Sequence, residues 1–262
     1  MNTFLAKQTI QYFLTAGHRF GHRIHSPFVF DLIQSVFLAK PSKSVFSKIE
    51  ERRRLLKRNS NEIEIRDFGA GSKRNGSNVR KISYIARTSA SNGKYARLLY
   101  NIAKRYQPRT ILELGTSLGI GTAYLAYGCR EAKLISLEGS ETIAAEAEKT
   151  MDFCGINSAK ILVGNFDDTL STALQQLQFV DCAYIDGNHT KEATLRYFEQ
   201  VLPYCNENSI LIFDDISWSE GMNEAWHTII ADERVRISVD ICKKGFVFFR
   251  KGIEKQDFTI RY

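Results

Sequence analysis

The sequence has no apolar run that approaches the ~18–20 residues of a membrane span. Its first stretch, MNTFLAKQTIQYFLTAG, lacks the basic start, continuous apolar core and small-residue cleavage site of a signal peptide. Apolar residues recur there at roughly helical spacing, which predicts a surface helix packed on the body of the protein. We therefore expect a cytoplasmic protein with no membrane span.

Paired cysteines are also missing. The five cysteines are scattered, and no two of them form a Cys-x-x-Cys pair. An odd and scattered set argues against a disulfide framework and against a zinc site. Several cysteines lie within apolar runs, where this residue usually acts as a small buried side chain. The pattern favours a reducing compartment.

Acidic residues are scarce in the first part of the chain. Residues 1–110 hold 22 Lys and Arg against 6 Asp and Glu, whereas the rest of the chain holds 14 against 23. This excess of positive charge predicts an anionic partner, such as an acidic small molecule or nucleic acid. A solvated basic surface that only aids solubility explains the excess equally well.

A glycine-rich turn organises the rest of the sequence. In ILELGTSLGIGTAYLA, Ile111–Ala126, a short apolar run leads into this turn, and a small-residue helical segment follows it. Strand, glycine turn and helix in this order are typical of a nucleotide-type cofactor site. Gly115, Gly119 and Gly121 do not have the Gly-x-Gly-x-x-Gly spacing of a dinucleotide site.

From residue 110 onward, strand-like and helix-like segments alternate. The strand candidates are 110–114, 133–137, 159–163, 179–185 and 208–213, and the helix candidates are 119–129, 141–155, 168–176, 190–204 and 219–231. This alternation predicts an α/β fold with a parallel sheet and helices on both faces. RISVDIC and FVFFRK, joined by Lys243-Lys244-Gly245, predict a closing antiparallel β-hairpin.

The residues before this pattern predict an N-terminal extension. Residues 1–58 look helical, with one helix starting at Ser26-Pro27. Residues 59–93 look loop-like and contain DFGAGS, which suggests a loop that covers the active site or binds an anion. We expect a helical and loop extension over residues 1–93, on the substrate side, and a main domain over 94–262.

The segment ELGTSLGIGT resembles the first motif of class I S-adenosylmethionine-dependent methyltransferases, (Asp/Glu)-x-Gly-x-x-x-Gly. Five parallel strands closed by a hairpin are also the order expected of a Rossmann-like methyltransferase. The resemblance implies that Glu113 helps to position the methionine part of the cofactor. It also implies that the backbone of the turn passes close to the cofactor at Gly115, Thr116, Ser117 and Gly119.

Two later turns complete the predicted cofactor site. Glu138 ends the second strand, 25 residues after Glu113, and a carboxylate there can accept both ribose hydroxyls. The alternative is that Glu138 only caps the next helix. In the family, the turn that holds Asn165 and Phe166 here contacts the adenine ring, although Phe166 could be a plain core residue.

Three acids follow the last two parallel strands. Asp186 ends the fourth strand, and Asp214 and Asp215 end the fifth. Neighbouring parallel strands place these carboxylates side by side, where they repel one another. A hard cation such as Mg²⁺ or Ca²⁺ would relieve the repulsion. The alternative is that one acid pairs with an arginine and another caps a helix.

This layout resembles the metal-dependent O-methyltransferases of the catechol and macrocin types. The resemblance implies Mg²⁺ on Asp186, Asp214 and Asp215, with Asp186 also beside the cofactor. It places the general base at His189, three residues after Asp186, where the macrocin group has a histidine. A histidine that caps the next helix or lies on the surface is the alternative.

The sequence therefore predicts Mg²⁺-dependent O-methylation of a small or sugar-like hydroxyl acceptor, one that could be anionic. A methyltransferase that acts on RNA or protein through the basic region is a second hypothesis. No Asn/Asp-Pro-Pro-Tyr/Phe motif is present, which counts against N-methylation of bases. A non-catalytic cofactor-binding protein is a third hypothesis. The sequence leaves the acceptor and the oligomeric state open, with a homodimer as one option.

Overall fold

The structure, a computed structural model, describes residues 3–17, 19–22, 24–65, 78–88 and 93–262. The chain forms two compact units. The central unit is Ala39–Leu177, and the terminal unit combines Met1–Leu38 with Gln178–Tyr262. These units do not follow the expected boundary between residues 93 and 94, which stays a prediction. No helix in the described ranges is long and apolar enough to cross a membrane.

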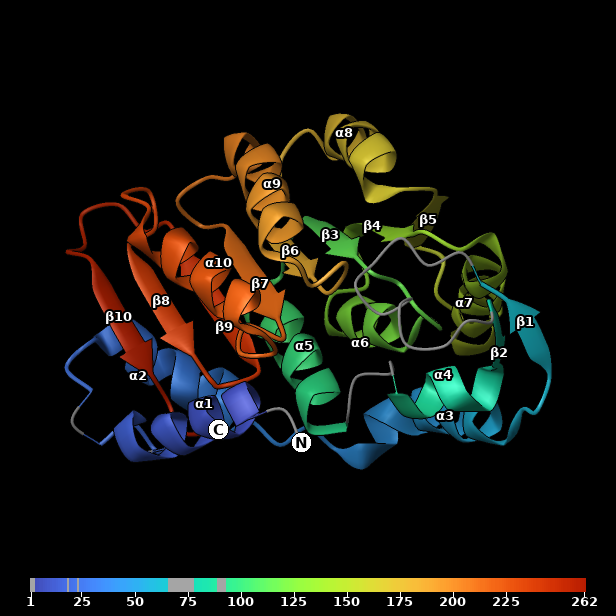
Figure 1. The fold of residues 1–262 in the computed structure, drawn as a ribbon, viewed down its shortest axis with the longest axis horizontal. Coiled ribbons are helices and arrows are strands. Elements are labelled where there is room, and N and C mark those ends of the chain that lie inside the picture. The colour runs from blue at the N-terminus through green and yellow to red at the C-terminus, as the bar shows by residue number, and fades with distance from the viewer. Residues whose placement is uncertain (1–2, 18, 23, 66–77, 89–92) are drawn as a thin grey trace. The chain divides into compact units, whose positions relative to one another are not determined.

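Three parallel strands form the core of the central unit (Figure 1). They are β3 (Thr110–Leu114), β4 (Lys133–Glu138) and β5 (Ala159–Val163). β4 pairs in parallel with both of its neighbours. Every residue of β3 is buried, and so is every residue of β4 after its first. Continuous burial of this kind is typical of parallel strands that are covered on both faces.

Helices alternate with these strands as the sequence predicts. They are α5 (Gly93–Tyr106), α6 (Ile120–Gly128), α7 (Glu141–Cys154) and α8 (Phe166–Leu177). α8 packs on all three strands, α7 packs on β4 and β5, and α5 packs along α6. The end of β3 and the start of α6 are thereby fixed on either side of the glycine turn.

A short hairpin and a helix lie where the sequence predicted only loop. β1 (Glu62–Glu64) pairs antiparallel with β2 (Val79–Lys81), and α4 (Ile82–Thr88) follows. The loop prediction was wrong for these residues because α4 is too short to show a helical period and β1 buries little. The DFGAGS segment lies outside the described residues.

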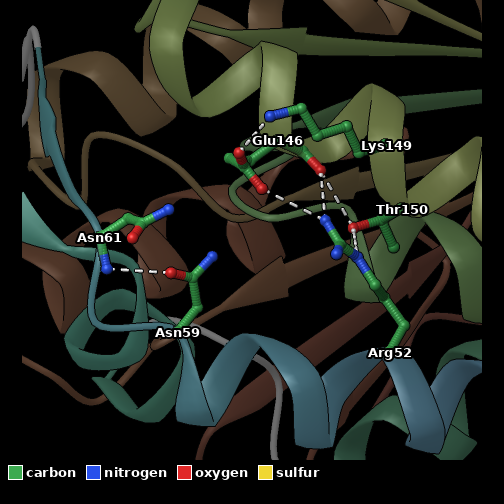
Figure 2. A network of polar contacts seen from close by, with 6 residues as sticks. All are labelled: Arg52, Asn59, Asn61, Glu146, Lys149 and Thr150. Carbon is green, nitrogen blue, oxygen red and sulfur yellow. Dashed lines mark hydrogen bonds and ion pairs between the residues drawn. The ribbon is translucent and has the colours of Figure 1, made fainter.

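The end of the region predicted to be helical, residues 1–58, consists of η2 (Lys43–Phe46) and α3 (Ser47–Arg58). Arg52 joins α3 to α7 (Figure 2). Its Nη2 lies 3.2 Å from Glu146 Oε2, and its Nε donates to Thr150 Oγ1 at 3.1 Å. The neighbouring Arg53 is buried. Part of the basic N-terminal sequence therefore serves packing within this unit.

Five strands form the sheet of the terminal unit, in the order β6, β7, β9, β8, β10 (Figure 1). They are β6 (Cys182–Ile185), β7 (Ile210–Asp214), β9 (Lys244–Phe248), β8 (Ile237–Asp240) and β10 (Gln256–Thr259). β6 and β7 are parallel, and β8 and β9 form the predicted antiparallel hairpin. β10, which pairs in parallel with β8, was not predicted.

The residues expected to turn the hairpin are partly strand. Lys244 and Gly245 belong to β9, and both are buried. The prediction placed them in the turn because a lysine pair followed by glycine usually marks an exposed connection. Here the side chain of Lys244 has a buried partner, which is described below.

The helices of the terminal unit confirm the α/β class. They are α1 (Thr3–Thr15), α2 (Pro27–Leu32), the π-helical turn η1 (Ile33–Phe37), α9 (Lys191–Val201), the short η4 (Leu202–Tyr204) and α10 (Glu220–Ala231). Ser26 is the N-cap of α2, as predicted. The hydroxyl of Tyr12 on α1 donates to Ile260 O at 2.6 Å, which confirms that the first helix packs on the protein.

Candidate functional site

The turn between β3 and α6 has the conformation that a close-approaching ligand requires. Gly115 and Gly119 have φ of +103° and +78°, and Ser117 lies between them at +49°. The N–H groups of Gly115 and Thr116 both donate to Leu137 O on β4. A Cβ on Gly119 would lie 2.8 Å from Met151 Cε and 3.1 Å from Ala147 O. The glycine is needed both for its backbone angle and for the contact with α7.

Glu113 is hydrogen-bonded to hydroxyl groups that surround the glycine turn. Its carboxylate is completely buried, and Oε2 accepts the hydroxyl protons of Thr122 at 2.5 Å and Ser136 at 2.6 Å. Because Ser136 gives its proton to Glu113, the hydroxyl of Thr116, 2.5 Å away, donates to Ser136. The predicted cofactor residue Glu113 therefore also joins β3, β4, α6 and the turn.

Glu138 reaches the turn from the end of β4. Its Oε2 accepts from Ser117 N at 2.9 Å, and its Oε1 accepts from Ser140 N at 3.0 Å, just before α7. The bond from Ser140 N supports the helix-cap alternative, and the bond from Ser117 N holds the carboxylate against the glycine turn. The helix-cap role is therefore present, and the ribose role of Glu138 stays a prediction.

A buried hydroxyl at the same turn has no protein partner. Ser117 Oγ is inaccessible to solvent and makes no hydrogen bond within the described structure. A buried hydroxyl normally has a partner. With Glu138 at the adjacent strand end, this orphaned donor fits a polar cofactor at the turn.

The turn after β5 is a helix cap. Asn165 O accepts from Asp168 N and Thr169 N, and Asn165 Oδ1 accepts from Asp167 N at 3.2 Å. Phe166 is the first residue of α8 and is half-buried. The side chain of Phe166 is therefore not a plain core residue, and the predicted adenine contact stays a prediction.

The other predicted site residues lie in the terminal unit, around the hydroxyl of Tyr184 on β6. That hydroxyl lies 2.6 Å from Asp186 Oδ2 and 2.7 Å from Asp214 Oδ2. Lys244 Nζ lies 2.6 Å from Asp214 Oδ2 and donates to the Tyr184 hydroxyl at 2.7 Å. Asp215 joins the cluster through its N–H, which donates to Asp214 Oδ1 at 2.9 Å. We call Tyr184, Asp186, Asp214 and Lys244 the acid cluster.

The pKa values of the two carboxylates in the acid cluster shift in opposite directions. Burial, followed by the charge of Asp214, raises the pKa of Asp186 well above its usual value. Burial also acts to raise the pKa of Asp214, but the charge and hydrogen bond of Lys244 and the hydrogen bond of Tyr184 act against it, and the net shift is downward. The two carboxylates differ because Lys244 Nζ contacts Asp214, whereas Asp186 contacts the Tyr184 hydroxyl.

His189 is close to the acid cluster. Its Nε2 lies 3.6 Å from Asp186 Oδ1, and its side chain is 29% exposed. His189 has a φ of +38°, after Asn188 at +67°. The N-cap of α9 is Thr190 and not His189. The helix-cap alternative for His189 is therefore excluded, and its role as the base stays a prediction.

The acid cluster does not fit a divalent cation as it stands. Within the described ranges, no three His, Cys, Asp or Glu side chains are grouped so that they could hold a metal ion. Lys244 Nζ lies against one oxygen of Asp214, and the other oxygen accepts the N–H of Asp215. These contacts occupy the Asp214 oxygens that the predicted Mg²⁺ site would need.

Sequence reasoning missed Tyr184 and Lys244. Tyr184 could have been found, because residues two apart on a strand share a face and Tyr184 precedes Asp186 by two. Lys244 gave no such signal, because its burial depends on pairing directly opposite Asp214 in the register of β7 and β9.

Comparison with known proteins shows a likeness to methyltransferases. Residues 112–216 match the family described as a methyltransferase domain. The chain is 30% identical over 131 residues to a catechol O-methyltransferase of Niastella koreensis, which covers 49% of this chain and 57% of the relative. A catechol O-methyltransferase of Mycobacterium tuberculosis is 29% identical over 136 residues, 51% of this chain and 59% of the relative. The chain thus spans less than two thirds of these curated relatives.

Solved structures show the same fold at low sequence identity. The SAH-bound methyltransferase PaMTH1 of Podospora anserina has a TM-score of 0.59 at 15% identity, over 86% of this chain and 97% of that one. The O-methyltransferase TomG of Streptomyces achromogenes has a TM-score of 0.57 at 17% identity, over 85% and 96%. The predicted Rossmann-like methyltransferase fold is confirmed. Residues 112–216 thus resemble a methyltransferase domain, and the chain resembles O-methyltransferases in sequence and in fold.

Proposed function

We propose that this protein is an S-adenosylmethionine-dependent O-methyltransferase that acts on a small or sugar-like hydroxyl acceptor. The observation that carries the proposal is Glu138, whose carboxylate bonds to the N–H of Ser117 in the glycine turn. The likeness of the chain to O-methyltransferases supports oxygen as the atom that is methylated.

The central unit would hold the cofactor. Glu138 would accept the ribose hydroxyls, and Asn165 and Phe166 would flank the adenine ring. The turn residues would surround the methionine part, with Glu113 beneath them; these are Gly115, Thr116, Ser117 and Gly119. When bound, S-adenosylmethionine supplies a methyl group on a positively charged sulfur.

The terminal unit would prepare the acceptor. His189 would accept the proton of the acceptor hydroxyl, and Nδ1 is the proposed acceptor atom because Nε2 lies toward Asp186. Holding the acceptor oxygen in line with the methyl group would supply much of the rate. Asp186 would steady the imidazole of His189, in addition to its predicted place beside the cofactor.

Calorimetric titration with S-adenosylmethionine tests the cofactor assignment. Glu138→Gln should weaken binding about 10-fold or more, because charge-assisted hydrogen bonds contribute roughly 1.5–3 kcal/mol. Glu141→Gln, an exposed acid in the first turn of α7, is the matched control and should bind as the wild type does. Wild-type protein that does not bind the cofactor would contradict the proposal.

Methyl transfer is then measured with tritium-labelled cofactor against catechol, a panel of sugars, and total RNA. Label in a small hydroxyl compound supports the proposal. Label in RNA alone would favour the alternative raised by the basic residues 1–110. With an acceptor in hand, His189→Ala should lower turnover about 10²- to 10⁴-fold, whereas the exposed His227→Ala should not. Unchanged turnover in His189→Ala would remove the assigned base.

A further inference from the structure

Lys244 is a lysine without access to solvent. It is the first residue of β9, its relative exposure is 2%, and it lies directly opposite Asp214 in the antiparallel register with β7. Burying an ammonium group is costly unless it is paired and hydrogen-bonded. Both conditions are met, since Nζ contacts Asp214 Oδ2 and the Tyr184 hydroxyl and lies 4.5 Å from the centre of the Tyr184 ring.

The surroundings of Lys244 hold it in the interior. A Cβ on the next residue, Gly245, would lie 2.4 Å from the indole of Trp226 on α10. Trp226 is buried and packs against Phe213, the residue before Asp214. The glycine lets the Trp226 indole lie against β9 on the sheet face opposite the Lys244 side chain, because successive strand residues point to opposite faces. The strand is therefore buried where Lys244 pairs with Asp214.

A positive charge is already present where a metal ion would bind Asp214. Lys244 Nζ, at 2.6 Å, lies against the Asp214 oxygen that also contacts Tyr184. Tyr184 in turn bridges Asp214 to Asp186, so one buried cation and one phenol organise both acids. A divalent cation that coordinated Asp214 Oδ2 would have to displace the buried Lys244 ammonium from that oxygen.

We infer that the Lys244 ammonium replaces the metal ion of this acid cluster, so that the protein binds no divalent cation there and needs none. Lys244 is a positioning residue, because it is buried and acts through Tyr184, Asp214 and Asp186. The consequence for catalysis rests on the proposed methyltransferase function. The consequence for metal binding does not, and it can be measured without cofactor or acceptor.

Binding of Mn²⁺ alone, followed by electron paramagnetic resonance, tests the inference. We expect no saturable binding to the wild type up to millimolar Mn²⁺. Lys244→Met should expose the carboxylates to the ion and bind Mn²⁺ at least about 10-fold more tightly than the wild type, since loss of the competing charge is worth more than roughly 1.4 kcal/mol. This gain should disappear in the double variant Lys244→Met with Asp214→Asn. Lys243→Met, which changes the preceding lysine, is the matched control and should behave as the wild type does.

Each result decides the question. Tight Mn²⁺ binding by the wild type that Asp214→Asn abolishes would overturn the inference. A folded Lys244→Met protein without any gain would also overturn it, because the lysine would then not be what excludes the ion. If Lys244→Met does not fold, the wild-type titration and Tyr184→Phe, which keeps the lysine and should still bind no Mn²⁺, decide it. Cofactor binding, measured separately, shows whether the proposed function stands.

Discussion

The two units hold their buried carboxylates in different ways. In the central unit, Glu113 accepts protons from the hydroxyls of Thr122 and Ser136, and Glu138 accepts from backbone N–H groups. In the terminal unit, Asp214 is paired with the Lys244 ammonium. Neutral donors orient a carboxylate and leave its charge in place, whereas an ammonium cancels that charge.

This difference separates two kinds of site. A carboxylate that keeps its charge suits a ligand with hydroxyl groups and a positive centre, as in S-adenosylmethionine. A carboxylate that is already neutralised suits the internal positioning of other side chains, here Asp186 and through it His189. Under the proposed function, Glu138 would bind the cofactor, Glu113 would hold the turn, and Asp214 would position Asp186.

The largest effect is expected from breaking the pair in the terminal unit. Asp214→Ala leaves the Lys244 ammonium buried without a counter-charge and should lower the free energy of unfolding by about 3–5 kcal/mol. Urea unfolding measures the loss. Glu224→Ala removes one partner of the exposed Lys191–Glu224 pair and should cost at most about 1 kcal/mol. A loss below about 1 kcal/mol for Asp214→Ala would mean that Lys244 is not held as described.

A smaller loss is expected from weakening the neutral donors of the central unit. Thr122→Val keeps the shape of the side chain but removes a hydrogen bond to the buried Glu113 carboxylate, which should cost about 1.5–3 kcal/mol. Thr228→Val, at an exposed position of α10, is the control and should change stability by less than about 0.5 kcal/mol. Equal unfolding free energies of the two variants would contradict the role given to Glu113.

The smallest effect is expected at the other buried cation. Among the residues that the structure describes, Arg53 Nε and Nη2 have no hydrogen-bond partner, and Glu50 Oε1 lies 3.6 Å from Nε. Arg53→Met keeps the apolar stem and removes a poorly paired charge, so stability should stay within about 1 kcal/mol of the wild type or rise. Lys244→Met should be much more destabilising in the same urea titration. A loss above about 3 kcal/mol in Arg53→Met would show that its pairing is stronger than the contacts indicate.

The sequence predicted the parts of the fold that repeat along the chain. β3, β4 and β5 were found because short apolar runs alternate with helical segments and glycine turns. α4, β1 and β2 were missed because elements of three to seven residues carry too little periodicity. β10 was missed because a short edge strand has no apolar alternation that marks it.

For the candidate site, the roles of the predicted residues stay predictions. The rule that ligands bind at the carboxyl ends of parallel strands made Glu113, Glu138, Asp186 and Asp214 candidates. It could not identify Lys244, because a buried lysine is stabilised only by a partner on another strand, and that pairing is absent from the local sequence. The metal ion was predicted because three acids follow the last two parallel strands. The local sequence does not show that the fold places Lys244 beside Asp214.

One measurement tests both sides of the comparison, namely calorimetric titration of the wild-type protein with S-adenosylmethionine in EDTA and again in excess Mg²⁺. The account predicts saturable binding with the same affinity in both buffers, since the central carboxylates bind the cofactor and Lys244 makes the metal unnecessary. Binding that appears only with Mg²⁺, or no binding in either buffer, would contradict it.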